Sequence, residues 1–261
     1  MKKKIRAKKS LGQHFLNDEL IAEQIVDSID IKNIDELIEI GPGMGVLSEF
    51  LLEKDIKTTF IELDNEAVDY LKVKFPEISD KIINKDFLKI DIENNFKGKL
   101  GIIGNFPYNI SSQILFKVYD NKDKVFELVG MFQKEVGARV ASKPGNRVYG
   151  ILSVLIQAYY DVEYLFTVGP EEFNPPPKIQ SGVIRLVRKE NTTLNCDSKL
   201  FKTVIKAGFN QRRKTLRNSL KGLLGDLKIE DDIMSKRPEQ LGFEEFVELT
   251  NIIDVLLKAN S

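Results

Sequence analysis

Short apolar runs alternate with amphipathic segments along the first two thirds of the chain. Strand-like runs occur at residues 36–40 and 58–62, just before residue 86, and at 100–104, and segments with helical spacing follow the first two. Asp18 is placed to cap an earlier amphipathic helix whose apolar side carries Ile21, Ile25, Val26 and Ile29. This alternation is typical of βαβ units, and it predicts an α/β fold with a mostly parallel sheet.

The pattern changes near residue 190. Further strand-like runs at 128–132, 164–168 and 183–187 surround a helical segment at 151–158, but beyond residue 188 only helical spacing remains. A polar stretch at 190–195 interrupts the apolar pattern at this point. We therefore predict a domain at 1–190, which carries the cofactor and begins with a basic arm, and a small all-helical domain at 191–261.

The composition excludes several classes of protein. Charged residues make up 30% and hydrophobic residues 42% of the 261 positions, so the chain is not a disordered or low-complexity protein. A single cysteine, Cys196, and a single histidine, His14, exclude a disulfide framework and a metal site rich in these residues, and we expect no metal. The chain has no run of 18 apolar residues and no signal segment, so we expect a soluble, cytoplasmic protein without a membrane partner.

Charge is unevenly distributed although the formal net charge is zero. Six of the first nine residues are Lys or Arg, and residues 199–221 hold eight basic residues and no acidic one. Residues 35–64 hold eight acidic residues against two lysines. A solvated helix face is the simpler explanation of one basic run, but two separate runs favour a polyanionic partner.

Candidate cofactor-binding residues follow three successive strands. Gly41-x-Gly43-x-Gly45 lies between a strand and a helix, where glycine lets the backbone approach a ligand. Glu62 ends the next strand and is placed to accept both ribose hydroxyls of a nucleoside. Asp86 follows the third strand, within reach of an adenine amino group. A tight turn and a helix cap are the alternatives for the glycines and Asp86, yet together the three positions favour an adenosine-containing cofactor.

The fourth strand ends in Asn105-Phe106-Pro107-Tyr108. This tetrapeptide resembles the N-x-P-Y motif of S-adenosylmethionine-dependent methyltransferases that act on exocyclic amines of bases. The Asn105 oxygen and the Phe106 carbonyl would hold the amine, Pro107 would stiffen the turn, and the face of Tyr108 would stack on an extruded base. A β-turn with a buried tyrosine is the alternative.

The resemblance extends along residues 8–256. Residues 9–16 resemble the K-x-x-G-Q-x-F-L opening of the rRNA adenine dimethyltransferase family, which implies that His14 and Leu16 line the cofactor pocket. Residues 173–181 resemble its F-x-P-x-P-K-x-x-S segment, which implies that Phe173 closes over the target base; a core phenylalanine is the alternative. Residues 209–220 resemble the F-x-x-R-R-K-T-L-x-N-x-L stretch of the 16S (KsgA/RsmA) branch.

The resemblance implies a Rossmann-like seven-stranded methyltransferase domain that uses S-adenosylmethionine, with Asn105 touching both cofactor and base. It implies dimethylation of the N6 amines of two adjacent adenosines near the 3′ end of 16S rRNA, within the 30S particle, and a role in small-subunit biogenesis. RNA would contact Arg212, Arg213, Lys214 and Arg217, on a helix with Leu216 and Leu220 inward. We expect a monomer. An Erm-type 23S rRNA enzyme, a DNA adenine methyltransferase and a protein acting chiefly in ribosome assembly are the alternatives.

Overall fold

The computed structural model describes residues 7–260, which divide into two compact units. Unit 1 comprises the chain up to residue 138 together with 161–188, and unit 2 comprises 139–160 and the chain from 189 onward. The sequence-based division at residue 190 assigned 139–160 to the first domain, whereas these residues group with the C-terminal helices. Four of the cations in the basic start lie at positions 2–6, outside the described residues.

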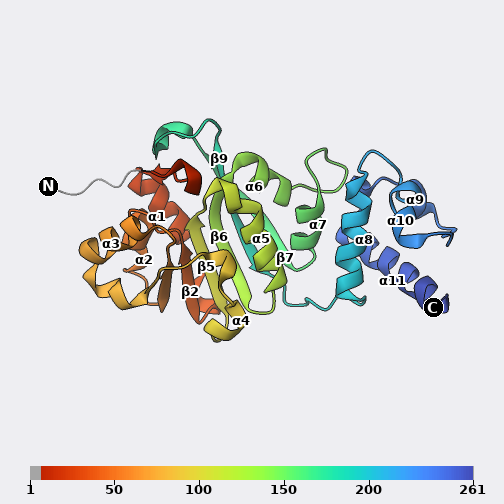
Figure 1. The fold of residues 1–261 in the computed structure, drawn as a ribbon, viewed down its shortest axis with the longest axis horizontal. Helices are drawn as coiled ribbons and strands as arrows, with labels where there is room; N and C mark the ends of the chain where they lie inside the picture. The colour runs from red at the N-terminus through yellow and green to blue at the C-terminus, as the bar shows by residue number, and fades with distance from the viewer. Residues whose placement is uncertain (1–6, 261) are drawn as a thin grey trace. The chain divides into compact units, whose positions relative to one another are not determined.

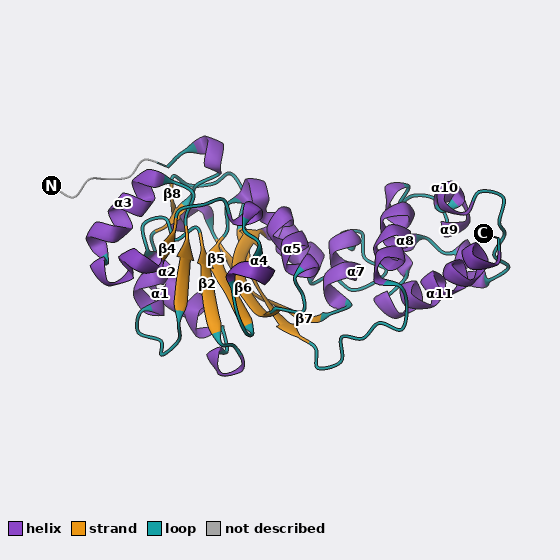
Figure 2. Cartoon of the chain, turned by 60° about the horizontal axis from the view of Figure 1, so that its bottom comes forward, coloured by secondary structure: helices purple, strands orange, loops and turns teal. Residues whose placement is uncertain are grey.

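Unit 1 is built around a seven-stranded sheet with the order β4-β3-β2-β5-β6-β9-β7 (Figures 1 and 2). The strands are β2 (Glu36–Ile40), β3 (Thr58–Ile61), β4 (Ile82–Ile83), β5 (Leu100–Asn105), β6 (Val125–Gln133), β7 (Tyr160–Val168) and β9 (Ser181–Arg188). The pairings from β4 through β6 are parallel, and β9 joins β6 antiparallel. The predicted α/β fold with a mostly parallel, seven-stranded sheet is confirmed.

Helices flank this sheet (Figure 2). They are α1 (Glu19–Asp27), α2 (Val46–Leu51), α3 (Asn65–Lys74), α4 (Ile92–Asn95) and α5 (Ser111–Asp120), with α6 (Lys134–Val140) after β6. Asp18 caps α1 as predicted, because its carboxylate accepts a hydrogen bond of 2.9 Å from the Ile21 amide. Ile25 and Leu47 pack with Ile103 of the sheet in one fully buried cluster.

A separate two-stranded sheet ties the N-terminal arm to unit 1. In it, β1 (Phe15–Leu16) pairs antiparallel with β8 (Phe173–Asn174), so that Phe15 lies opposite Asn174 and Leu16 opposite Phe173. The pairing joins segments more than 150 residues apart in the chain. It fixes residues 11–16 along the edge of the pocket described below.

Unit 2 is helical. Its elements are α7 (Ile151–Gln157), α8 (Ser198–Asn210), α9 (Leu216–Ser219), α10 (Lys221–Leu224) and α11 (Phe243–Ala259), and no strand is described beyond residue 188. Leu216 and Leu220 are fully buried, as predicted. The single helix expected to carry them together with Arg212, Arg213 and Lys214 is not formed, because residues 211–214 make a turn and α9 is one helical turn. Within the described part of the chain, no helix combines the length and apolar character needed to cross a bilayer.

Candidate active site

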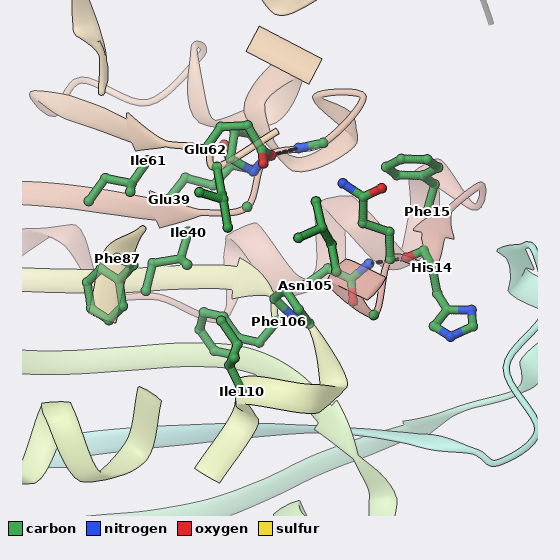
Figure 3. Close-up of a pocket in the computed structure, with 18 of the residues that line it drawn as sticks. His14, Phe15, Glu39, Ile40, Ile61, Glu62, Phe87, Asn105, Phe106 and Ile110 are labelled. Atoms are coloured by element: carbon green, nitrogen blue, oxygen red, sulfur yellow. Dashed lines mark hydrogen bonds between the residues drawn. The ribbon is translucent and has the colours of Figure 1, made fainter. Parts of the chain in front are cut away.

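One pocket lies at the carboxyl ends of β2, β3 and β5, where a parallel sheet places the residues that follow its strands (Figure 3). The sequence-predicted residues that line it are His14, Leu16, Gly41, Gly43, Glu62, Asp86, Asn105, Phe106, Pro107 and Tyr108. The residues predicted to bind the cofactor and the Asn105–Tyr108 motif therefore line the same cavity.

The glycine turn and Glu62 are joined by hydrogen bonds. Gly41 and Gly43 adopt positive φ angles of 68° and 58°, which side chains rarely allow. The Gly43 amide donates to Glu62 Oε2 at 3.0 Å, and the Asp64 amide donates to Glu62 Oε1 at 2.8 Å. Burial raises the pKa of Glu62, and these two amides oppose that shift. Each carboxylate oxygen keeps a lone pair for another donor, which a sugar hydroxyl could supply.

Asp86 caps a short helical turn and also borders the pocket. Its Oδ1 accepts a hydrogen bond of 2.9 Å from the Leu88 amide, so the capping interpretation is correct for one oxygen, and Oδ2 remains for a ligand. The nearby wall is apolar: Phe87 is buried, but Leu63 is 50% exposed. A half-exposed leucine lining a cavity offers a surface that a flat aromatic ligand would cover.

The amide of Asn105 has a fixed orientation. Its Nδ2 donates a hydrogen bond of 2.9 Å to the backbone carbonyl of His14, drawn as a dashed line in Figure 3. The Oδ1 atom is therefore left to accept from a ligand. His14 contributes its backbone carbonyl to this arrangement, whereas its imidazole ring lies toward the side chain of Tyr108.

Phe106 is accommodated by two glycines on the strands beside it. Its ring is 1% exposed and lies 4.8 Å from the ring of Phe132. A Cβ atom built on Gly130 would lie 2.0 Å from Phe106 Cε2, and one on Gly104 would lie 2.8 Å from Cε1. The side chain of Phe106 therefore anchors the motif in the sheet, and its amide donates a hydrogen bond of 3.1 Å to the Met131 carbonyl.

Tyr108 is held at both its ends. Its hydroxyl hydrogen-bonds to the hydroxyl of Ser181, a fully buried residue that begins β9. Its ring lies 5.3 Å from the ring of His14, whose Nδ1 is 2.7 Å from the Pro175 carbonyl oxygen. Burial raises the pKa of Tyr108, so the phenol stays protonated near neutral pH. The ring orientation is set by elements distant in sequence.

Phe173 does not line the pocket, which corrects the role expected for it. Its side chain is 3% exposed and packs in the cluster of Leu16, Met131 and Val183. Pairing between β1 and β8 directs it into this core, so in this structure it offers no face to a base. The alternative interpretation, a core phenylalanine, is the one observed.

The four predicted RNA-contacting residues lie in unit 2. Arg213, Lys214 and Arg217 are exposed and Arg212 is half-buried, in the turn after α8 and on α9.

Three functional features escaped the sequence analysis. Glu39, just before the glycine turn, lines the pocket and accepts a hydrogen bond from Ser48 at 2.7 Å; burial raises its pKa to about 8. The sequence signal that could have identified Glu39 was an acidic residue between apolar neighbours in a buried strand. Ser181 is the last residue of the segment at 173–181 that resembles a family motif, but the sequence assigned it no function. Asp64 receives hydrogen bonds from Lys8 at 2.5 Å and Gln13 at 3.1 Å, which link the arm to the turn after Glu62.

Comparison with known proteins gives consistent matches over the whole chain. A family model described as ribosomal RNA adenine dimethylase matches residues 4–252. The ribosomal RNA small subunit methyltransferase A of Flavobacterium johnsoniae is 56% identical over 253 residues, which cover 96% of this chain and 97% of that protein. The protein of the same name from Parabacteroides distasonis is 56% identical over 252 residues, covering 95% of this chain and 94% of that protein.

Two solved structures share the fold. A dimethyladenosine transferase from Plasmodium falciparum has a TM-score of 0.79 and 24% identity, covering 93% of this chain and 98% of that one. The 23S rRNA methyltransferase ErmE has a TM-score of 0.67 and 19% identity, covering 91% and 99%.

Proposed function

Because the chain belongs to the ribosomal RNA adenine dimethylase family, we propose that it dimethylates the N6 amines of two adjacent adenosines near the 3′ end of 16S rRNA. The acceptor would be the 30S particle, and the protein would act as a cytoplasmic monomer with a part in small-subunit biogenesis. One observation carries the proposal: Asn105, oriented by the His14 carbonyl, lines the same cavity as the glycine turn and Glu62.

The residues present fit S-adenosylmethionine. Glu62 would accept from the ribose hydroxyls, Asp86 Oδ2 from the adenine amine, and Leu63 would cover the adenine ring, while the glycine turn allows close backbone approach. When bound, this cofactor supplies an electrophilic methyl group on its sulfonium. Glu39, which is 2% exposed, supports the turn through Ser48.

The motif residues would act by orientation. The N6 lone pair of adenine is delocalised into the ring and is a poor nucleophile. Asn105 Oδ1 and the Phe106 carbonyl would accept its two N–H groups and favour a tetrahedral nitrogen, which frees the lone pair for bond formation. Tyr108, held by Ser181, would stack on the base. The nitrogen would lose its proton to solvent after the N–C bond has formed, when it is positively charged and acidic, so no side chain in this scheme has to act as a strong base.

The choice of the small subunit is supported by the relatives. Both proteins at 56% identity carry a name that refers to the small ribosomal subunit. Arg212, Arg213, Lys214 and Arg217 would contact the rRNA backbone, and selection would come from the shape of the RNA and the base pocket.

The test is methyl transfer from labelled S-adenosylmethionine to unmethylated 30S particles, with mass spectrometry of the digested RNA. We expect N6,N6-dimethyladenosine from the wild-type protein and about 100- to 1,000-fold slower transfer by Asn105→Ala, which should still bind S-adenosylhomocysteine. Equal turnover by Asn105→Ala would remove its assigned role. Absence of transfer by a wild-type protein that binds the cofactor would contradict the proposal and favour a role in assembly alone.

A further inference from the structure

The loop at residues 143–148, between α6 and α7, carries cations that the site described above does not use. Residues 139–160 contain three basic side chains, Arg139, Lys143 and Arg147, and no acidic one. Lys143 and Arg147 are exposed. The loop belongs to unit 2, together with the basic segment at 199–221.

Hydrogen bonds dock this loop against the end of α8 (Figure 1). Arg212 Nη2 donates to the carbonyl oxygen of Asn146 at 3.2 Å, and the Gly145 amide donates to the carbonyl oxygen of Glu239 at 2.6 Å. At the end of the loop, the buried ring of Tyr149 lies 6.3 Å from the ring of Phe209 on α8. The 143–148 loop and the turn at 211–214 are therefore neighbours, although 60 or more residues separate them in the chain.

The exposed cations of this loop and of the neighbouring turn are not in ion pairs with any residue that the structure describes, although Glu239 contacts the loop through its backbone carbonyl. Among the described residues, Lys143, Arg147, Arg213 and Lys214 form no ion pair. Some lysines elsewhere are paired: Lys54 lies 2.6 Å from Asp27, Lys74 lies 2.9 Å from Glu49, and Lys236 lies 2.7 Å from Glu245. Neighbouring like charges repel one another, and a polyanion offsets that repulsion.

We propose that Lys143 and Arg147 extend the surface of Arg212–Lys214 into one phosphate-contacting site for the backbone of folded RNA. The inference rests on the proposed function, which supplies an RNA partner, and adds a segment to its binding surface. The loop exposes no aromatic side chain, since Tyr149 is buried, so it would contact phosphates and not stack on bases. Arg212 would have a second role, because its contact with Asn146 places the loop.

The test compares Lys143→Ala/Arg147→Ala with Lys72→Ala/Lys97→Ala, a control that removes the same charge from two exposed lysines of unit 1. Binding to unmethylated 30S particles is titrated at several KCl concentrations, and thermal unfolding and S-adenosylhomocysteine binding verify the fold. The loop variant should lose roughly tenfold in affinity at low salt, and the slope of log K against log salt should fall by about 2. The control should keep the wild-type slope.

Three results would overturn the inference in distinguishable ways. A loop variant with wild-type affinity and slope, beside a wild-type protein that binds and methylates 30S particles, would remove this surface alone. An equal loss in the control would assign the effect to overall charge. Binding of wild-type protein to vesicles of anionic phospholipid but not to ribosomal particles would reject RNA as the partner and the proposed function with it.

Discussion

Gly130 on β6 should be essential to the geometry of the catalytic motif. In Gly130→Ala, the new Cβ would lie 2.0 Å from Phe106 Cε2, about 1.4 Å short of the 3.4 Å at which ordinary contact begins. Both residues are buried, so the Phe106 ring has to move by an ångström or more. Overpacking of this kind costs about 1–3 kcal/mol, and a 1 Å displacement at a reacting centre can cost roughly 100-fold in rate.

Two assays check this prediction. Thermal unfolding of Gly130→Ala should shift down by roughly 2–12 °C for a chain of this size, and methyl transfer to 30S particles should fall about 100-fold with cofactor affinity retained. Phe106→Leu in the same background should recover part of both losses, because leucine lacks the ring atom that clashes. Alanine inside a strand is ordinarily more stabilising than glycine, so a loss of stability in Gly130→Ala would have to come from the clash with Phe106. Wild-type stability and turnover in Gly130→Ala, or a double variant no better than the single one, would refute the reasoning.

Four further predictions concern the pocket. Asn105→Ala should lose about 100- to 1,000-fold in methyl transfer and should retain S-adenosylhomocysteine binding that calorimetry can measure. Glu62→Ala should weaken that binding roughly 10- to 100-fold, since hydrogen bonds to a charged group are lost; unchanged affinity would exclude Glu62 as a ligand. Ser181→Ala removes the hydroxyl that binds Tyr108 and should raise KM for the particle more than it lowers kcat. Ser181→Thr keeps the hydroxyl and should restore the wild-type KM; an equal effect of both variants would indicate that Ser181 acts through packing alone. The pKa of Glu39 is about 8 in the folded protein and 4.5 in the unfolded chain. The contribution of Glu39 to stability therefore falls as pH rises between these two values. In Glu39→Gln, the melting temperature should depend less on pH over this range.

The strands and the cofactor end of the pocket could be predicted because their signals are local. The glycines Gly41 and Gly43 directly after a buried strand are sufficient to predict a turn at that place. Parallel strands bring Glu62 and Asp86 to the same edge of the sheet. Within the seven-stranded sheet, the expected and observed strands differ mainly at their ends, whereas β1 and β8 were not expected.

The remaining features depend on long-range contacts that no local pattern carries. Leu16 pairs with Phe173 across more than 150 residues, and this pairing buries a phenylalanine that was expected to face the base. The orientation of Asn105 depends on a carbonyl 91 residues earlier in the chain. Residues 139–160 group with the C-terminal helices because α7 packs against α8 and α11, which their spacing could not indicate.

The central claim is tested most directly by offering the protein three acceptors in parallel: unmethylated 30S particles, 50S particles and duplex DNA, each with labelled S-adenosylmethionine. The labelled nucleoside is identified by mass spectrometry and its position is mapped. We predict N6,N6-dimethyladenosine at two adjacent adenosines of 16S rRNA in the 30S sample alone. Label in the 50S particle or in DNA instead would contradict the assigned substrate while leaving the description of the pocket in place.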